Sequence, residues 1–220
     1  MQTIQDANDY LLFGANTSEN INWNFINMLG GRFIIADGMI NKPFLTPKAY
    51  LNDPQQVLFE NSSALPKAWF VKETKTFGSE KEIMMQMKDT SFSPMNTALL
   101  LNHYQANKFT GVGSVKPITI SPNKILFDCS TDSDQFMVVS EMYYPKGWIT
   151  SIDNKETEIV KTNILLRGIY VPAGKHKVEF IFQPETYFAA VKISWAGNII
   201  SLLLLISLAY FEFFKGKNKQ

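Results

Sequence analysis

The longest apolar run of the chain lies near its C-terminus, over Ile193 to Phe214. It reads ISWAGNIISLLLLISLAYFEFF and has no charged residue from Ile193 to Phe211. At a rise of about 1.5 Å per residue, such a helix is roughly 28–33 Å long, which matches a bilayer hydrocarbon core of about 30 Å. A single span must be helical, because every backbone polar group in the bilayer needs an internal partner. The pattern predicts a transmembrane helix over 193–214; the alternative is a buried core helix of a soluble domain.

The residues around this span predict an orientation. Lysines follow the span, at Lys215, Lys217 and Lys219. They favour a cytoplasmic tail over 215–220 and place the preceding domain on the exterior side. The first 14 residues, MQTIQDANDYLLFG, have neither a basic region nor a long apolar region, so they do not form a signal peptide. Two interpretations follow: a tail-anchored protein with a cytosolic domain, or the C-terminal part of a longer protein whose upstream helices set the topology.

From residue 115 to residue 184 the chain alternates short apolar strands with turn residues. Such spacing is typical of an antiparallel sandwich. The turns include Asp153-Asn154, which suit a two-residue hairpin, and Pro172-Ala173-Gly174. The expected strands are Val115–Ser121, Lys124–Cys129, Gln135–Met142, Trp148–Ile152, Glu156–Val160, Leu165–Val171 and Lys177–Gln183.

The first 114 residues have a mixed pattern. Helices are expected over Glu19–Leu29, from Pro54 to Phe59 with Asp53 as the cap, and after Ser79, which forms a capping box with Glu82. Strands are expected over Arg32–Ala36, Leu65–Thr74 and Thr97–Leu101, and the proline-rich stretch 41–55 is expected to be a loop.

Together these patterns predict a mainly β protein. It has an antiparallel, β-sandwich-like exterior domain with a few short helices, and one C-terminal transmembrane helix. The expected parts are a mixed α/β region over 1–114, the sandwich over 115–184, a juxtamembrane linker over 185–192, the span over 193–214 and the basic tail over 215–220.

Composition narrows the function classes. The formal net charge is +1, which gives no support to a nucleic-acid partner. The single Cys129 excludes an internal disulfide framework and a cysteine zinc site, and it is expected to be a small buried hydrophobe. His103 and His176 lie far apart in sequence and make a poor metal set. With no phosphate-binding glycine loop, HExxH or nucleophile elbow, we expect no cofactor, no metal and no catalytic residue here.

The densest candidate binding stretch reads SEMYYPKGW. It places Glu141, Tyr143, Tyr144 and Trp148 at the end of a strand and in the following loop, with Arg167 on a later strand. Aromatic faces stack on sugar rings and a carboxylate accepts hydrogen bonds from sugar hydroxyls, so these five residues are a candidate glycan contact. In the structural alternative, Trp148 and one tyrosine fill the end of the sandwich and Glu141 pairs with Arg167.

The stretch from Ser140 to Pro184 resembles the C-terminal region of the bacterial YfhO-type membrane protein family. The resemblance rests on SEMYYPKGW, the turn at Asp153, a strand with Arg167, the segment PAGKHKV and the strand end at Pro184. Lys146 is an insertion, and Asn154 stands where the family has glycine. Upstream, ALPKAWFV and INMLGGRFIIA are similar to further family segments, so the resemblance extends over most of residues 20–214.

The resemblance implies a function. Family members are many-pass membrane proteins, similar to C-type glycosyltransferases, that move sugars from a polyprenyl-phosphate carrier onto cell-surface acceptors. Their catalytic acid lies in a region to which nothing here corresponds. The implied chain is a non-catalytic exterior β-domain with the last transmembrane helix. Its implied partners are the lipid bilayer, upstream transmembrane helices, and a polyprenyl-linked sugar or acceptor glycan.

Two other functions compete with this one. The first is a single-anchor, membrane-tethered binding or scaffold protein; the second, an isolated enzyme, lacks any spaced acid, base or nucleophile. If the span is the last helix of a many-pass protein, Asn198 and the small residues beside it should face other helices. These small residues are Ala196, Gly197 and Ser201.

Overall fold

The computed structural model describes residues 21–51, 55–89 and 91–217, with the backbone alone at 185 and 211–217. The described residues form two units. The first, here called the β-unit, comprises the residues up to Tyr144 together with Ile149–Ile181. The second, the helical unit, comprises Pro145–Trp148 and the residues from Phe182 onward.

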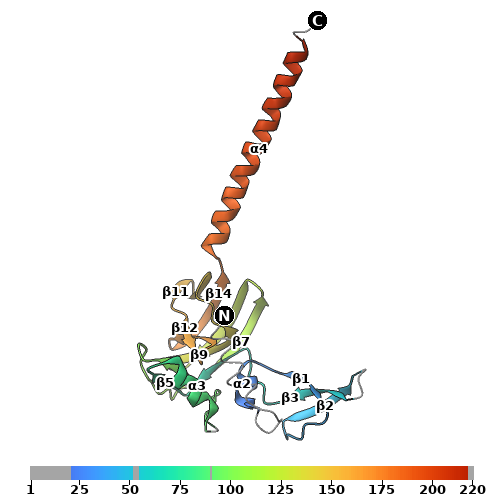
Figure 1. Ribbon diagram of the computed structural model, residues 1–220. Coiled ribbons are helices and arrows are strands. Elements are labelled where there is room, and N and C mark those ends of the chain that lie inside the picture. Colours follow the sequence, from blue (N-terminus) through green and yellow to red (C-terminus); the bar gives the residue numbers. More distant parts are fainter. Residues whose placement is uncertain (1–20, 52–54, 90, 218–220) are drawn as a thin grey trace. The chain divides into compact units, whose positions relative to one another are not determined.

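Two sheets that face each other make up the sandwich of the β-unit (Figure 1). The first has the strand order β11-β10-β14-β8-β7, and the second has the order β12-β13-β9-β4. Cys129 on β8 and Met137 on β9 meet between them, with their sulfur atoms 3.6 Å apart. The strands of the first sheet are β7 (Gly113–Ser121), β8 (Lys124–Thr131), β10 (Trp148–Ile152), β11 (Lys155–Thr157) and β14 (Gly174–Phe182). Those of the second are β4 (Ala68–Val71), β9 (Gln135–Met142), β12 (Val160–Thr162) and β13 (Leu166–Val171).

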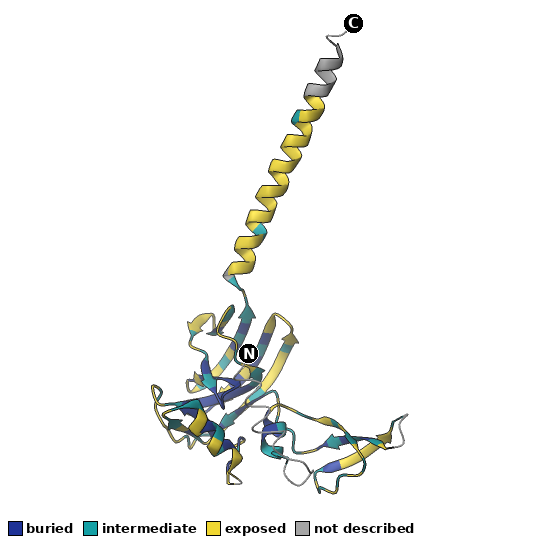
Figure 2. Cartoon of the chain, in the orientation of Figure 1, coloured by how far each residue is buried: buried dark blue, intermediate teal, exposed yellow. Residues whose placement is uncertain are grey.

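The second sheet is buried on both faces. Successive residues of a strand point to opposite faces. Met137 faces the first sheet, whereas Phe136 and Val138 pack into a core on the other side. That core is covered by helices α2 (Trp23–Met28) and α3 (Glu80–Lys88) and by the parallel pair β5 (Glu73–Phe77) and β6 (Thr97–Leu101). Part of the dark blue surface of the strands in Figure 2 belongs to this interior.

Helix α3 explains why one strand pair is parallel in an otherwise antiparallel fold. Parallel neighbours need a crossover connection, and α3 supplies it between β5 and β6. The expected capping box starts the helix: the Ser79 side chain accepts a hydrogen bond from the Glu82 N–H. The Glu82 carboxylate accepts from the Ser79 hydroxyl and from the Gly78 N–H, not from the Ser79 N–H.

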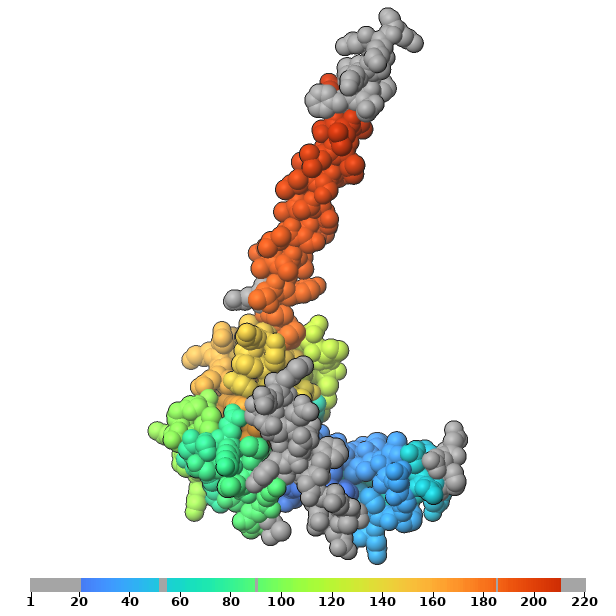
Figure 3. All heavy atoms as spheres, viewed as in Figure 1, coloured from blue at the N-terminus to red at the C-terminus, as the bar shows by residue number. Residues whose placement is uncertain are grey.

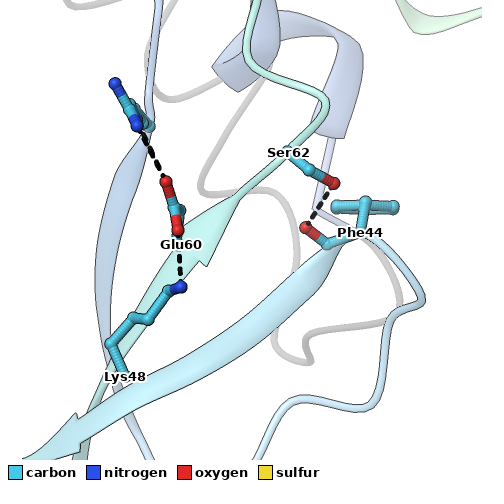
Figure 4. A network of polar contacts seen from close by, with 5 residues as sticks. Phe44, Lys48, Glu60 and Ser62 are labelled. Atoms are coloured by element: carbon cyan, nitrogen blue, oxygen red, sulfur yellow. Dashed lines mark hydrogen bonds and ion pairs between the residues drawn. The ribbon is translucent and has the colours of Figure 1, made fainter.

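A third sheet, of order β1-β3-β2, has a small core of its own. Its strands are β1 (Phe33–Asp37), β2 (Leu45–Tyr50) and β3 (Gln56–Asn61). Leu45, Val57 and Phe59 are buried, and partly buried side chains that include Trp23 and Phe44 pack against them. Glu60 on β3 forms ion pairs with Lys48 on β2 at 2.7 Å (Figure 4) and with Arg32, directly before β1, at 2.9 Å. These exposed pairs contribute little to stability, on the order of 0–1 kcal/mol each.

The structure corrects the sequence interpretation of residues 41–59. The expected loop contains strand β2, and the expected helix from Pro54 to Phe59 is strand β3. Pro47 is tolerated in β2 because β2 is an edge strand and its pairing shifts register between Pro47 and Ala49. In β3 the residues are alternately buried, as a strand requires. Asp53 and Pro54, the expected cap and first residue, lie outside the described residues.

Most other predicted elements are confirmed. Strands β6, β9 and β10 have the expected bounds, and the hairpin at Asp153-Asn154 has the positive φ angles of 49° and 68° that its turn requires. Two predicted strands are each two strands instead. Residues 65–74 contribute to β4 and β5, and residues 156–160 to β11 and β12. In both places the chain leaves one sheet for another.

The helical unit contains one long helix, α4 (Glu185–Lys217). Its stretch Thr186–Tyr210 is long and apolar enough to cross a membrane, and none of it is buried by the protein. Figure 3 shows its side chains, orange to red, as an uncovered column. The hydroxyls of Ser201 and Ser207 donate to the carbonyls of Gly197 and Leu204, both at 2.9 Å, so these polar groups are satisfied within the helix.

Candidate functional site

Glu141, near the end of β9, forms an ion pair with Lys67, which directly precedes β4. The pair joins neighbouring strands of the second sheet, because β4 and β9 are hydrogen-bonded to each other. Both side chains are partly buried. The sequence alternative expected Arg167 to be the partner of Glu141, and it missed Lys67.

Arg167 on β13 is 3% exposed. Its Nε donates a hydrogen bond to the Met142 carbonyl at 2.9 Å, and its guanidinium lies 6.0 Å from the centre of the Phe180 ring. Burial lowers the pKa of Arg167, while the negative charge of Glu141 acts in the opposite direction. This setting favours a structural role for Arg167 between the two sheets over contact with a ligand from solvent.

The aromatic residues of the candidate stretch fall into both units. In the β-unit, Tyr143 donates its backbone N–H to the Leu165 carbonyl at 2.5 Å, and Tyr144 is 53% exposed. In the helical unit, the ring of Trp148 packs 5.3 Å from that of Phe182. That contact favours the structural alternative for Trp148 and leaves Tyr144 as the most exposed ring of the candidate glycan contact.

Gly147 lets the chain turn within the helical unit. Its φ is +95°, which L side chains rarely adopt. A Cβ at this position would also lie 2.9 Å from the Cβ of Pro184. The Gly147 carbonyl accepts a hydrogen bond from the Gln183 N–H at 2.5 Å. Glycine is therefore required where the segment before Trp148 passes the start of α4.

A second polar site lies at the opposite end of β10, where the hairpin to β11 is attached to β14. The Asp153 carboxylate meets His176 Nδ1 at 2.7 Å and accepts a hydrogen bond from the Lys177 N–H at 2.8 Å. The His176 Nε2 lies 3.2 Å from the Ala173 carbonyl. The hydrogen bond with Asp153 raises the pKa of His176, and the same bond lowers the pKa of Asp153.

Two open grooves adjoin this Asp153–His176 pair. One, of about 610 Å³, is lined by residues of β7, β8 and β14, namely Ser114, Lys116, Asp128, Cys129, Ser130, Lys175 and Lys177 as well as the pair itself. The other, of about 480 Å³, includes Tyr170 and Glu156. We call the first the lysine groove. Both are large enough for a small-molecule ligand.

Comparison with known proteins decides the family. Residues 43–194, more than half of the chain, match the family model of the bacterial membrane protein YfhO. The chain belongs to the YfhO family. Within this YfhO chain the matched region runs from just before β2 into α4, so it includes the sandwich and the start of the apolar helix. Searches of curated proteins and of solved structures give no match.

The YfhO family resemblance seen in the sequence is thereby confirmed, and with it the assignment of the chain to a family of membrane proteins.

Cys129 is 3% exposed, and burial raises the pKa of its thiol to about 12, so the thiol stays protonated at neutral pH. This confirms the interpretation of Cys129 as a small buried hydrophobe. Among the residues that the structure describes, no three His, Cys, Asp or Glu side chains are grouped as a metal site.

Sequence reasoning missed the Asp153–His176 pair. It interpreted Asp153 only as a hairpin residue and His176 only as one of two histidines too far apart in sequence to form a metal set. Each interpretation is compatible with the structure, but the pairing depends on β10 lying beside β14 in the sheet. No local pattern specifies that neighbourhood, because 23 positions separate the two residues. The one available signal was a carboxylate in a hairpin turn and an imidazole at the start of a strand.

Proposed function

We propose that the β-unit and α4 form a non-catalytic exterior part of a many-pass YfhO-type protein that moves a sugar from a polyprenyl-phosphate carrier to a cell-surface acceptor. The observation that carries the proposal is the family match over residues 43–194, which includes the sandwich and enters α4. The lysines after the apolar stretch of α4 support an exterior β-unit, because cytoplasmic ends of spans are enriched in Lys and Arg.

The proposed task of the β-unit is to hold the acceptor glycan. Tyr144 offers an exposed ring for stacking on a sugar, and Glu141 lies three residues away with its charge shared with Lys67. Arg167 donates a hydrogen bond to the Met142 carbonyl at this end of the sheet, and Trp148 belongs to the helical unit. The expected site is thus narrower than the five residues named from the sequence.

A glycan-binding screen with the full chain in neutral detergent tests this task. Tyr144→Ala should weaken binding about two- to tenfold, the scale of one aromatic stacking contact. Tyr50→Ala is the matched control, because Tyr50 is 68% exposed on β2 of the third sheet. Binding of no glycan, or equal loss in both variants, would remove the glycan-holding task; an unchanged Trp148→Ala variant would exclude Trp148 from it.

The many-pass context is tested separately. Reading the genomic frame upstream of Met1 should reveal a series of apolar helices. If it does not, the single-anchor binding or scaffold protein becomes the better description. Sugar transfer by the purified chain alone, from a polyprenyl-phosphate sugar to an acceptor, would contradict the non-catalytic assignment.

A further inference from the structure

The lysine groove lies on the outer face of the five-stranded sheet. Along β8 the inward residues are buried, whereas Asp128 and Ser130 are exposed. Along β14, Lys175 and Lys177 are exposed, and along β7 so are Ser114 and Lys116. The register brings these outward positions together: Asp128 pairs with Lys116 on one side and Lys177 on the other, and Ser130 pairs with Ser114 and Lys175.

The three groove lysines differ from five other lysines that the structure describes in the β-unit. Within the described ranges, Lys116, Lys175 and Lys177 have no carboxylate within ion-pair distance. The five lysines that form ion pairs with glutamates are Lys48, Lys67, Lys75, Lys124 and Lys161. Three ammonium groups without such partners on one face are therefore a local accumulation of positive charge.

The acidic residues at the groove cancel only part of this charge. Both oxygens of Asp153 are engaged, one by His176 and the other by the Lys177 N–H. Asp128 is the second carboxylate that lines the groove, so three lysines face two carboxylates, one of which is paired with His176. The two hydroxyls of Ser114 and Ser130 add hydrogen-bond donors to the same surface.

This combination of donors points to a class of ligand. Phosphate oxygens accept several charge-assisted hydrogen bonds at once, and lysine ammonium groups and hydroxyls are suitable donors for them. We propose that the lysine groove binds a phosphate-bearing anion, supplied either by a lipid headgroup or by a water-soluble phosphate compound. The site does not depend on the glycan-holding task, because it shares no residue with the Glu141–Trp148 stretch.

Calorimetric titration of the full chain in neutral detergent tests the proposal. The soluble probe is inorganic pyrophosphate; the lipid probes are short-chain phosphatidylglycerol and, as its zwitterionic counterpart, short-chain phosphatidylcholine. Saturable binding of pyrophosphate, of phosphatidylglycerol or of both supports the site, and the probe that binds identifies the source. Failure of both anionic probes would overturn the proposal.

Variants distinguish the groove from general charge attraction. Lys116→Gln with Lys177→Gln should weaken binding about tenfold, since each exposed charge contact accounts for roughly three- to fivefold. Asp128→Asn should strengthen it, because one of the two lining carboxylates is removed. Lys48→Gln makes the same charge change as one groove variant on another sheet and should alter binding less than about twofold. Equal weakening by Lys48→Gln, or weakening by Asp128→Asn, would contradict a site in the groove.

Discussion

Strand β9 and helix α4 are both strongly apolar, but the apolar side chains of β9 are buried and those of α4 are exposed. Phe136 to Val139 on β9 are 0% exposed, covered by a sheet on one face and by α3 and β6 on the other. Leu202 to Leu205 on α4 are 58–64% exposed. Apolar surface of this extent is stable only away from water. The described residues therefore cover β9, whereas the exposed apolar surface of α4 is that of a candidate membrane span.

Of the substitutions that test this difference, one in the buried strand β9 should have the largest effect on stability. Phe136→Ala should destabilise the β-unit by about 3–5 kcal/mol, because a large ring is removed from a closed interior. The ring packs edge-on against Tyr170 at 4.8 Å, and a Cβ at Gly168 would lie 2.3 Å from its Cζ. Chemical unfolding of the full chain in detergent measures the change. Leu203→Ala in α4 is the control and should leave the unfolding free energy of the β-unit within about 0.5 kcal/mol.

A charge in α4 should produce the next largest effect. Leu203→Arg should oppose membrane insertion by about 2.5–3.5 kcal/mol, since an arginine near the middle of a span must leave water. Extraction of membranes at alkaline pH measures the fraction that stays integrated, which should fall. Met85→Arg makes the same charge change at a residue 53% exposed on α3 and should leave integration unchanged. Full integration of Leu203→Arg would argue against α4 as a span.

A smaller effect is expected where α4 would meet other helices. Apart from the neighbouring residues and the helix's own nearby backbone, no described atom lies within 4 Å of the position that a Cβ on Gly197 would occupy, so a larger side chain fits the isolated helix. In a many-pass protein, Gly197→Leu should weaken helix association by about 1 kcal/mol. Unfolding of the β-unit should not change. The readout is recovery of the assembled full-length protein after detergent extraction, and unchanged recovery would contradict a helix partner at this position.

The smallest effect concerns the exposed, charged end of the β-unit. The raised pKa of His176 stabilises the fold below its ordinary value of about 6.5 and loses this effect as pH rises through the folded pKa. The lowered pKa of Asp153 stabilises it above about 3.9 and loses this effect as pH falls. Asp153→Asn should move the pKa of His176 back toward about 6.5 in an NMR titration. The stability difference from wild type should be larger at about pH 6 than at about pH 9; a His176 pKa that does not move would contradict the pairing.

How far the fold could be predicted depended on whether a pattern was local. The apolar runs in Thr97–Leu101 and Gln135–Met142 are buried almost throughout. Like the short run Trp148–Ile152, they can be recognised within each strand, and these bounds were right. Prolines misled the prediction in β2, where an edge position removes the usual cost of the missing N–H. Pro117 on the edge strand β7 sits at a similar register shift, and that strand was recognised because its alternation is longer.

The remaining errors arise from pairings between distant segments. Glu156–Val160 looked like one strand, but Lys155–Thr157 and Val160–Thr162 pair in different sheets. The same limit hid the Glu141–Lys67 and Asp153–His176 contacts, whose partners lie 74 and 23 positions apart. For the candidate site, the sequence located the exposed Tyr144 but could not show that Arg167 is buried.

Thiol labelling in intact cells tests most directly the central claim that a membrane-spanning α4 carries an exterior β-unit. Cys129 is buried and gives little background. Met85→Cys provides an exposed thiol on α3, and Lys219→Cys introduces a thiol into the sequence after the apolar stretch. We expect a membrane-impermeant maleimide to label Met85→Cys in intact cells and to label Lys219→Cys only after permeabilisation. The reverse pattern would place the β-unit in the cytosol and contradict the claim.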